Sequence, residues 1–524
     1  MKKNRLLFLP FFAGLVLMAY SWYMSYPLSI NSGKDVVFNH VSIFYWISIP
    51  LVLMSMCLMA ISFENSYWKW IMVVCSVITI YSLFYFYRTL PTSDANYFRG
   101  LTENFARTKN LDPSAPIHSY YQWPSFFILA NIVTQVSGFE LVTYEFLLFT
   151  IIGFLLATTL YVYASKAYVQ SGFLAVVAFF IVSFYFLNYQ AVPFSLALGL
   201  LFLLFMLETR KKSSSVILSM LVLYINISIM HAFIPLFFVL YLLMRSIVSR
   251  SKQYFNLFIL TLIIYFSVQF TLAQYFFPTA IISMLTSPTE YSSIVSGTLT
   301  PVSITTDVLA QAFSRIVTIA FAMICIAGFV LMAIKRRMRE MDKAILLTGV
   351  IYSGFGVVIY TLGSRALPIA FIPISLGVLY LYESRLRPYL TCFILILMFL
   401  FVSISIHTSF GGSSIAFQTE EAQTTANFMI EKYPWNLTSI VISDVGAEWY
   451  IAPQIQGHTE IDSPFSARFL TSNITAYDCI VYSIGLEKTL QWNNVSIEET
   501  SQLVLDRFSV VYSSGSSYLA EKTR

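Results

Sequence analysis

The residues with the clearest capacity for chemistry stand together between two long apolar runs. The segment opens with Asp94, Asn96, Tyr97 and Arg99 and, after a polar stretch, closes with His118, Tyr121 and Trp123-Pro124. Because Asp94 comes soon after the apolar run 71–87, we expect it at a membrane surface. A partly desolvated carboxylate there holds a proton readily and suits general-base catalysis. The alternative interpretation is that Asp94 caps the short helix that follows it.

Candidate substrate-binding residues accompany Asp94 in this segment and recur at three other places. An arginine can bind a phosphate through two parallel hydrogen bonds, and a histidine can hydrogen-bond one in either charge state. Each also has a structural alternative. His231 could simply occupy a helix junction, and Arg365 could extend to the membrane interface. Tyr189 could belong to an interfacial aromatic belt, and Arg99 could lie on a solvated helix face. The candidates are Tyr97, Arg99, His118, Tyr121, Tyr189, Gln190, His231, Arg315 and Arg365.

The composition places the chain in the membrane class. Hydrophobic residues make up 57% of the sequence and charged residues only 11%, whereas soluble domains have about 45–50% and 25%. The mean hydropathy is +0.72. We read the first apolar run as a membrane helix and not as a cleavable signal, because no clear small-residue cleavage site follows it.

Thirteen apolar runs predict about thirteen transmembrane helices, although several runs are short for a span of about 20 residues. None of them contains Asp, Glu, Lys or Arg, which counts against an ion-coupled transport path. The runs are 6–24, 42–62, 71–87, 146–164, 173–187, 191–207, 213–230, 231–244, 255–275, 316–334, 344–362, 366–382 and 389–406.

The distribution of basic residues predicts the topology. If the N-terminus is cytoplasmic, the clusters at 2–5, 210–212, 245–252 and 335–343 all fall on the cytoplasmic side, as the positive-inside rule requires. This holds only if the 14 residues of 123–136 do not span, so we expect a juxtamembrane or re-entrant helix there. The prediction is a multi-pass plasma-membrane protein whose C-terminal tail lies outside.

The tail, residues 407–524, differs from the rest of the chain. Acidic residues outnumber basic ones in it, and it carries sequons at Asn436, Asn473 and Asn494. Strand-like runs at 439–442, 479–482 and 509–512 alternate with polar stretches such as 419–432. We expect an all-α polytopic membrane domain over residues 1–406, with an outer loop at 88–145, and a small extracytoplasmic α/β domain over 407–524.

The outer loop resembles a known family. An early acidic residue followed by tyrosine (Asp94, Tyr97), then aromatic residues with Trp123-Pro124, then a short apolar helix ending at Ser137-Gly138, is similar to the first extracytoplasmic loop of GT-C glycosyltransferases. Protein mannosyltransferases and lipid A aminoarabinose transferases belong to that superfamily. The resemblance covers residues 68–250 best, and topology contributes more to it than any motif.

This resemblance implies an inverting glycosyltransferase that moves a sugar from a polyprenyl-phosphate-linked donor to a glycan, lipid or protein acceptor at the outer face. Asp94 would be the general base, and His231 with Arg365 or Arg315 would neutralise the leaving phosphate. The loop has a lone Asp94, and the next outer loop (188–190) has no acid. A divalent metal is therefore possible but not favoured, and we expect no cofactor.

Other classes of function remain open at this point. A polyprenyl-linked glycan flippase or transporter would need a hydrophilic path through the membrane. A non-catalytic membrane scaffold would use the tail to bind partners and would need no acid in the loop. Nucleic acid is not an expected partner, because no basic patch interleaved with aromatic residues is present, whereas membrane lipid is. The five cysteines and five histidines have no zinc spacing.

Overall fold

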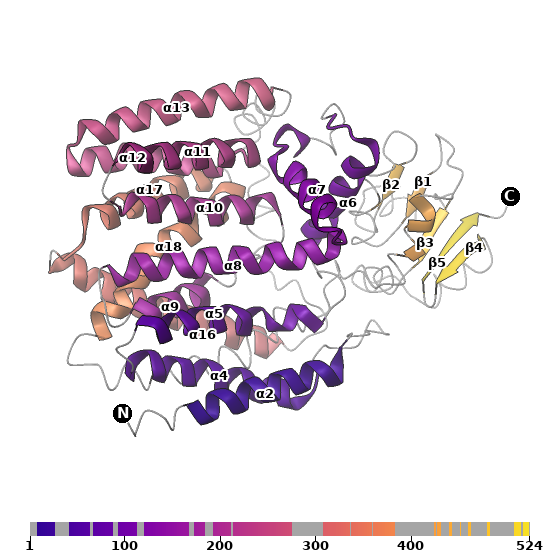
Figure 1. Cartoon of the computed structure of the whole chain (residues 1–524), viewed down its shortest axis with the longest axis horizontal. Helices are drawn as coiled ribbons and strands as arrows, with labels where there is room; N and C mark the ends of the chain where they lie inside the picture. Colours follow the sequence, from indigo (N-terminus) through magenta and orange to yellow (C-terminus); the bar gives the residue numbers. More distant parts are fainter. Residues whose placement is uncertain are drawn as a thin grey trace.

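A computed structural model shows a bundle of long helices lying side by side, with a small sheet beyond one end of the bundle (Figure 1). The structure describes residues 8–26, 41–62, 66–86, 93–112, 120–166, 172–183, 192–210, 213–274, 308–335, 337–358, 360–382 and 393, and in the tail 424–425, 427–430, 440–442, 451, 460–462, 479–482, 508–514 and 517–522.

The first part of the chain leads into the central helix α8 and adds two helices outside the parallel stack. α8 packs against α5, α7, α9 and α10, and α6 packs against α7. The elements are α2 (Phe8–Ser25), α4 (Ile43–Ser62), α5 (Ser66–Tyr81), the 3₁₀ helix η1 (Ser82–Phe86), α6 (Ser93–Thr108), α7 (Ser125–Ser137) and α8 (Leu141–Ser165).

The remaining helices complete the bundle around α8. Strong packing joins α12 to α13 and α17, and α18 to α9, α16 and α17. These helices are α9 (Gly172–Ser183), α10 (Pro193–Glu208), α11 (Ser214–Met230), α12 (Ile234–Ser249), α13 (Lys252–Leu272), α16 (Val308–Ile334), α17 (Glu340–Val358) and α18 (Tyr360–Tyr382).

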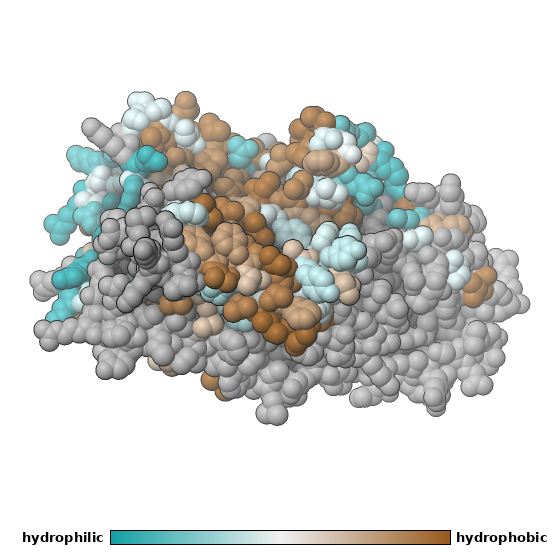
Figure 2. Space-filling model, turned by 60° about the horizontal axis from the view of Figure 1, so that its bottom comes forward, coloured by the Kyte–Doolittle hydropathy of each residue, from teal (hydrophilic) through white to brown (hydrophobic). Residues whose placement is uncertain are grey.

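The apolar helices indicate a membrane protein. Among the described residues, three helices are both long and apolar enough to cross a membrane, α2, α8 and α13, and shorter apolar helices accompany them. Their outward faces carry large exposed hydrophobic side chains such as Phe12, Ile151 and Phe270. Figure 2 shows brown, apolar residues over the middle of the coloured surface and teal, hydrophilic ones at its left and at its upper right. Lipid chains would cover such a surface.

The predicted runs and the observed helices agree closely up to residue 382. Each of the first twelve apolar runs coincides with a described helix, while the thirteenth, 389–406, lies almost wholly outside the described residues. The segment predicted as a short helix at 123–136 is α7, which has 13 residues and is too short to span. The number of spans and the topology stay predictions.

One predicted boundary is wrong. The apolar runs ended one helix at residue 362 and placed Arg365, which follows Gly363-Ser364, at the start of the next. In the structure α18 already begins at Tyr360, so all three residues lie within that helix. The helix can continue through Gly363, since a lone glycine costs a helix only about 1 kcal/mol.

The described tail residues include a five-stranded mixed sheet of order β2-β1-β3-β5-β4. Strand β1 pairs in parallel with β2 and β3, while β5 pairs antiparallel with β3 and β4. The three predicted strand runs coincide with β1, β3 and β4, whereas β2 and β5 were not foreseen. The strands are β1 (Ile440–Ile442), β2 (Glu460–Asp462), β3 (Cys479–Tyr482), β4 (Phe508–Ser514) and β5 (Ser517–Lys522). An independent α/β domain stays a prediction.

Two glycines allow α16 and α18 to approach backbone to backbone. A Cβ atom on Gly377 would meet the Cys325 carbonyl oxygen, and one on Gly328 would meet the Gly377 carbonyl oxygen, both far inside contact distance. Backbone atoms cannot move aside as a flexible side chain can. Small residues at such a crossing let membrane helices pack closely, where the hydrophobic effect no longer drives them together.

We therefore expect Gly377→Ala to destabilise the protein by about 1–3 kcal/mol through overpacking. The matched control is Gly199→Ala, since a Cβ at Gly199 would meet only side-chain atoms of Leu155 and Ile152, none nearer than 3.5 Å. Thermal unfolding in detergent or nanodiscs compares the two variants. Equal melting temperatures for both would contradict the close crossing.

Candidate functional site

Helices α6 and α7 form a cap over one end of the bundle, on the side where the sheet lies (Figure 1). Phe98 of α6 packs edge-on against the Tyr120 ring, with centroids 4.8 Å apart, and also contacts Phe126 and Phe127. Tyr97 lies edge-on to Tyr120 as well, at 6.1 Å. This aromatic cluster joins α6 to the start of α7.

A buried ion pair fixes α6 to the central helix. Arg99 is 1% exposed and Glu145, on α8, is 3% exposed. The Arg99 Nε donates to both carboxylate oxygens of Glu145, at 3.1 and 3.0 Å, and Nη2 donates to Oε2. Arg99 therefore does not lie on a solvated face, and that alternative is wrong. An arginine bound through two nitrogens in this way holds a helix at a defined angle.

The capping segment is also hydrogen-bonded to helices far along the chain. Trp123 Nε1 donates to Gln269 Oε1 of α13 at 3.1 Å, and Gln269 Nε2 donates to the Ser228 carbonyl of α11 at 3.4 Å. All three residues are buried. The start of α7 and the C-terminal ends of α11 and α13 therefore meet at the same end of the bundle.

Tyr121 is buried within the cap and hydrogen-bonded there. Its hydroxyl donates to the Leu101 carbonyl at 2.6 Å and accepts from Asn104 Nδ2 at 3.2 Å. Burial raises the pKa of Tyr121 to about 12, and burial also raises the pKa of Tyr97. Both phenols are neutral at physiological pH, so they can supply hydrogen bonds but not charge.

His231 occupies the turn between α11 and α12 and is 4% exposed. Its Nδ1 accepts hydrogen bonds from the backbone N–H groups of Phe233 at 3.1 Å and Ile234 at 3.4 Å. These groups belong to the first turn of α12, whose donors need acceptors from outside the helix. With Nδ1 as an acceptor, the neutral imidazole carries its proton on Nε2, which makes Nε2 a donor.

The other predicted residues are placed only in part. Asp94 lies in the first turn of α6, Arg315 in α16 and Arg365 in α18, but their side chains lie outside the described residues. His118, Tyr189 and Gln190 lie outside them altogether. The structure thus brings Tyr97, Arg99, Tyr121 and the His231 turn to one end of the bundle. A substrate-binding role for any of them stays a prediction.

Two residues that organise this end were missed from the sequence. Glu145 directly precedes the predicted span 146–164, but α8 begins five residues before that span and includes the glutamate. Gln269 lay unnoticed within an apolar run. A lone acid or amide at the end of an apolar helix needs a buried partner, and that was the available signal.

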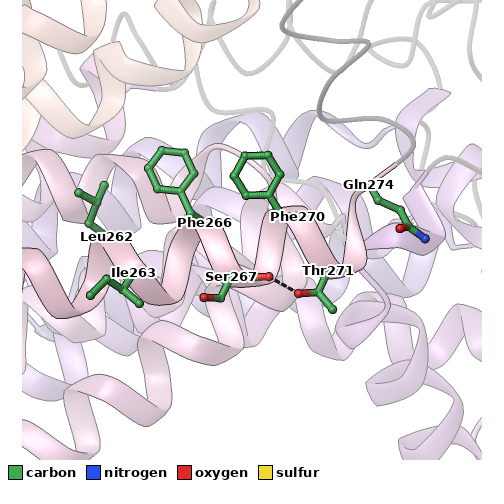
Figure 3. A pocket seen from close by; sticks show the side chains of 7 residues that line it. All are labelled: Leu262, Ile263, Phe266, Ser267, Phe270, Thr271 and Gln274. Carbon is green, nitrogen blue, oxygen red and sulfur yellow. Dashed lines mark hydrogen bonds between the residues drawn. The ribbon is translucent and has the colours of Figure 1, made fainter.

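A shallow groove follows one face of α13 near the same end (Figure 3). The Phe266 and Phe270 rings project in the same direction, and Ser267 and Thr271 lie alongside, with the Thr271 hydroxyl bonded to the Ser267 carbonyl. None of the seven lining residues is titratable, so the groove is no candidate for acid–base chemistry. The lining residues are Leu262, Ile263, Phe266, Ser267, Phe270, Thr271 and Gln274.

Within the described residues no group of three or more His, Cys, Asp or Glu side chains could hold a metal ion. Comparison of the sequence with protein-family models found no match, and comparison with curated proteins found no relative. The site is therefore interpreted from its own residues.

The Arg99–Glu145 pair offers a direct test of how the cap is attached. We expect Arg99→Met or Glu145→Leu alone to cost about 3–5 kcal/mol, because each leaves an uncompensated buried charge. The double variant Arg99→Met/Glu145→Leu should recover most of that stability, since it buries no charge. Thermal unfolding of the four proteins closes the cycle. Additive losses would contradict direct pairing.

The capping role of His231 Nδ1 can be tested apart from any role of Nε2. Asparagine can present an acceptor near the position of Nδ1 but has no equivalent of Nε2–H, so His231→Asn should keep the stability of the native protein. His231→Ala should lose about 0.5–2 kcal/mol, as other helix N-terminal caps do. Melting temperatures decide the matter, and an asparagine variant as unstable as the alanine variant would rule out the cap.

Proposed function

We propose that the protein is a membrane glycosyltransferase. It transfers a sugar from a polyprenyl-phosphate-linked donor to a glycan, lipid or protein acceptor at the outer face of the plasma membrane. The N-terminus is cytoplasmic and the tail is extracytoplasmic in this proposal. The observation that carries it is the hydrogen-bonded cap, which joins the loop containing Asp94 to the ends of α11 and α13.

This arrangement suits a reaction at a membrane surface. The donor's lipid chain needs apolar helix faces, and its phosphate and sugar need polar groups at the end of the bundle. Asp94, in the first turn of α6, accepts the proton of the acceptor hydroxyl as that oxygen attacks the sugar's anomeric carbon. The bond from that carbon to the phosphate oxygen breaks, and the carrier phosphate leaves with the electron pair.

The leaving phosphate gains negative charge in the transition state, so positioned donors accelerate the reaction. In the proposal these are the Nε2–H of His231 and the guanidinium of Arg365 or Arg315. The buried Arg99 positions α6 in the proposal, since Glu145 engages its guanidinium. The mechanism needs no metal.

The test is turnover of a panel of polyprenyl-phosphate sugars by the reconstituted protein, with Asp94→Asn beside the native chain. Loss of a general base should lower the rate by about 10²–10⁴-fold while donor binding persists. The matched control is Asp112→Asn, which removes an exposed acid from the same loop and should leave the rate unchanged. Full activity in Asp94→Asn would refute the role of Asp94, and no donor binding by any variant would favour a scaffold.

A further inference from the structure

The opposite end of the bundle holds a second polar network, in which the acids are engaged by two arginines. Arg245 of α12 donates to Glu208 of α10 at 3.3 Å and to Glu340 of α17 at 2.7 Å. The Tyr254 hydroxyl of α13 donates to the same Glu208 oxygen at 2.7 Å. Four helix ends are therefore tied together here.

The second arginine extends this network to α8. Arg339 donates to both oxygens of Asp342, at 3.0 and 2.9 Å, and to the Tyr163 carbonyl at 3.3 Å. The Tyr163 hydroxyl donates to Asp342 as well. Nearby, Lys166 Nζ donates to the Thr209 carbonyl at 2.7 Å, which satisfies the C-terminal end of α10.

Arg245 and Arg339 bind the acidic residues of this network. A set of exposed basic side chains remains at the same end of the bundle. We call this set the cationic end. It draws on the ends of α8 and α10, the α12–α13 turn and the α16–α17 turn. Partial burial and then the neighbouring Arg210 and Arg339 lower the pKa of Lys166. The exposed residues are Lys166, Arg210, Arg250, Lys252, Lys335, Arg337 and Lys343.

Exposed apolar side chains adjoin these cations. Ile334 directly precedes Lys335 and is 68% exposed, Ile247 of α12 is 59% exposed, and Phe255 of α13 is 49% exposed. A soluble anion such as phosphate would use only the charges. A ligand with an anionic head and a hydrocarbon chain would use both features, since the chain covers the apolar positions while the head contacts lysine and arginine.

We propose that the cationic end binds the headgroups of anionic phospholipids in the membrane leaflet at that end of the bundle. Each exposed lysine or arginine contacts phosphate oxygens at the surface, and the adjoining apolar residues contact the first methylenes of the acyl chains. This interaction lies at the opposite end of the molecule from the cap and does not depend on the proposed transferase activity.

The test measures lipid selectivity of the full chain in nanodiscs of phosphatidylcholine containing a fixed fraction of phosphatidylglycerol. Spin-labelled analogues of the two lipids report their relative association with the protein. The variant Arg210→Gln/Lys335→Gln should lose phosphatidylglycerol preference by about fivefold per cation removed, from about 1 kcal/mol per basic residue near a membrane surface. Salt at about 1 M should weaken the native preference.

The matched control is Arg107→Gln/Lys109→Gln, which removes two exposed cations from the other end and should keep the native selectivity. A second pair, Lys252→Gln/Lys343→Gln, decides the question if the first does not fold. Equal losses in test and control pairs, or no native preference, would overturn the proposal. Displacement of the lipid by excess inorganic phosphate would instead indicate a soluble-anion site and would also overturn it.

Discussion

Helix α8 takes part in a contact with a buried carboxylate near each of its ends, and the arrangement of the bundle depends on both contacts. Near its start Glu145 binds Arg99 of α6, and near its end Tyr163 donates to Asp342, which Arg339 also binds. A charge taken out of water costs several kcal/mol unless a partner compensates it. Each contact therefore defines how the two helices lie relative to each other. Apolar packing alone would not define this, because apolar side chains can repack in more than one way.

The two ends of the bundle differ in which charged side chains remain exposed after the buried ion pairs have formed. At the α6–α7 end the paired arginine is internal, and the segment carries the exposed cations Arg107 and Lys109 together with the acids Glu103 and Asp112. At the other end pairing engages the acids and leaves cations exposed. Such asymmetry orients a membrane protein, because basic residues favour the cytoplasmic side. It also separates a region suited to substrate chemistry from one suited to holding the protein in its leaflet.

Much of the helical framework could be predicted from the sequence, because hydrophobic run length reports directly on membrane helices. The position of α7 followed from charge counting. The contacts that could not be predicted are those between residues distant in the chain. The role of Glu145 depends on its ion pair with Arg99 on α6, and the role of Gln269 depends on its hydrogen bond with Trp123. The boundary between the runs 344–362 and 366–382 was misplaced because a glycine in an apolar helix looks the same locally whether it ends the helix or lies within it.

The cap bears on the choice between catalysis and transport. A transporter moves one part of its bundle against another, and its ionisable groups line the path. Here the buried pairs join neighbouring helices near their ends, and the Trp123–Gln269–Ser228 chain joins the cap to two more helices. Fixed hydrogen bonds at that end hinder alternating access, and they suit the surface site of the proposed transferase. Preorganised donors and a fixed base are what a group-transfer reaction needs, since polar groups already in place need no reorganisation as charge develops.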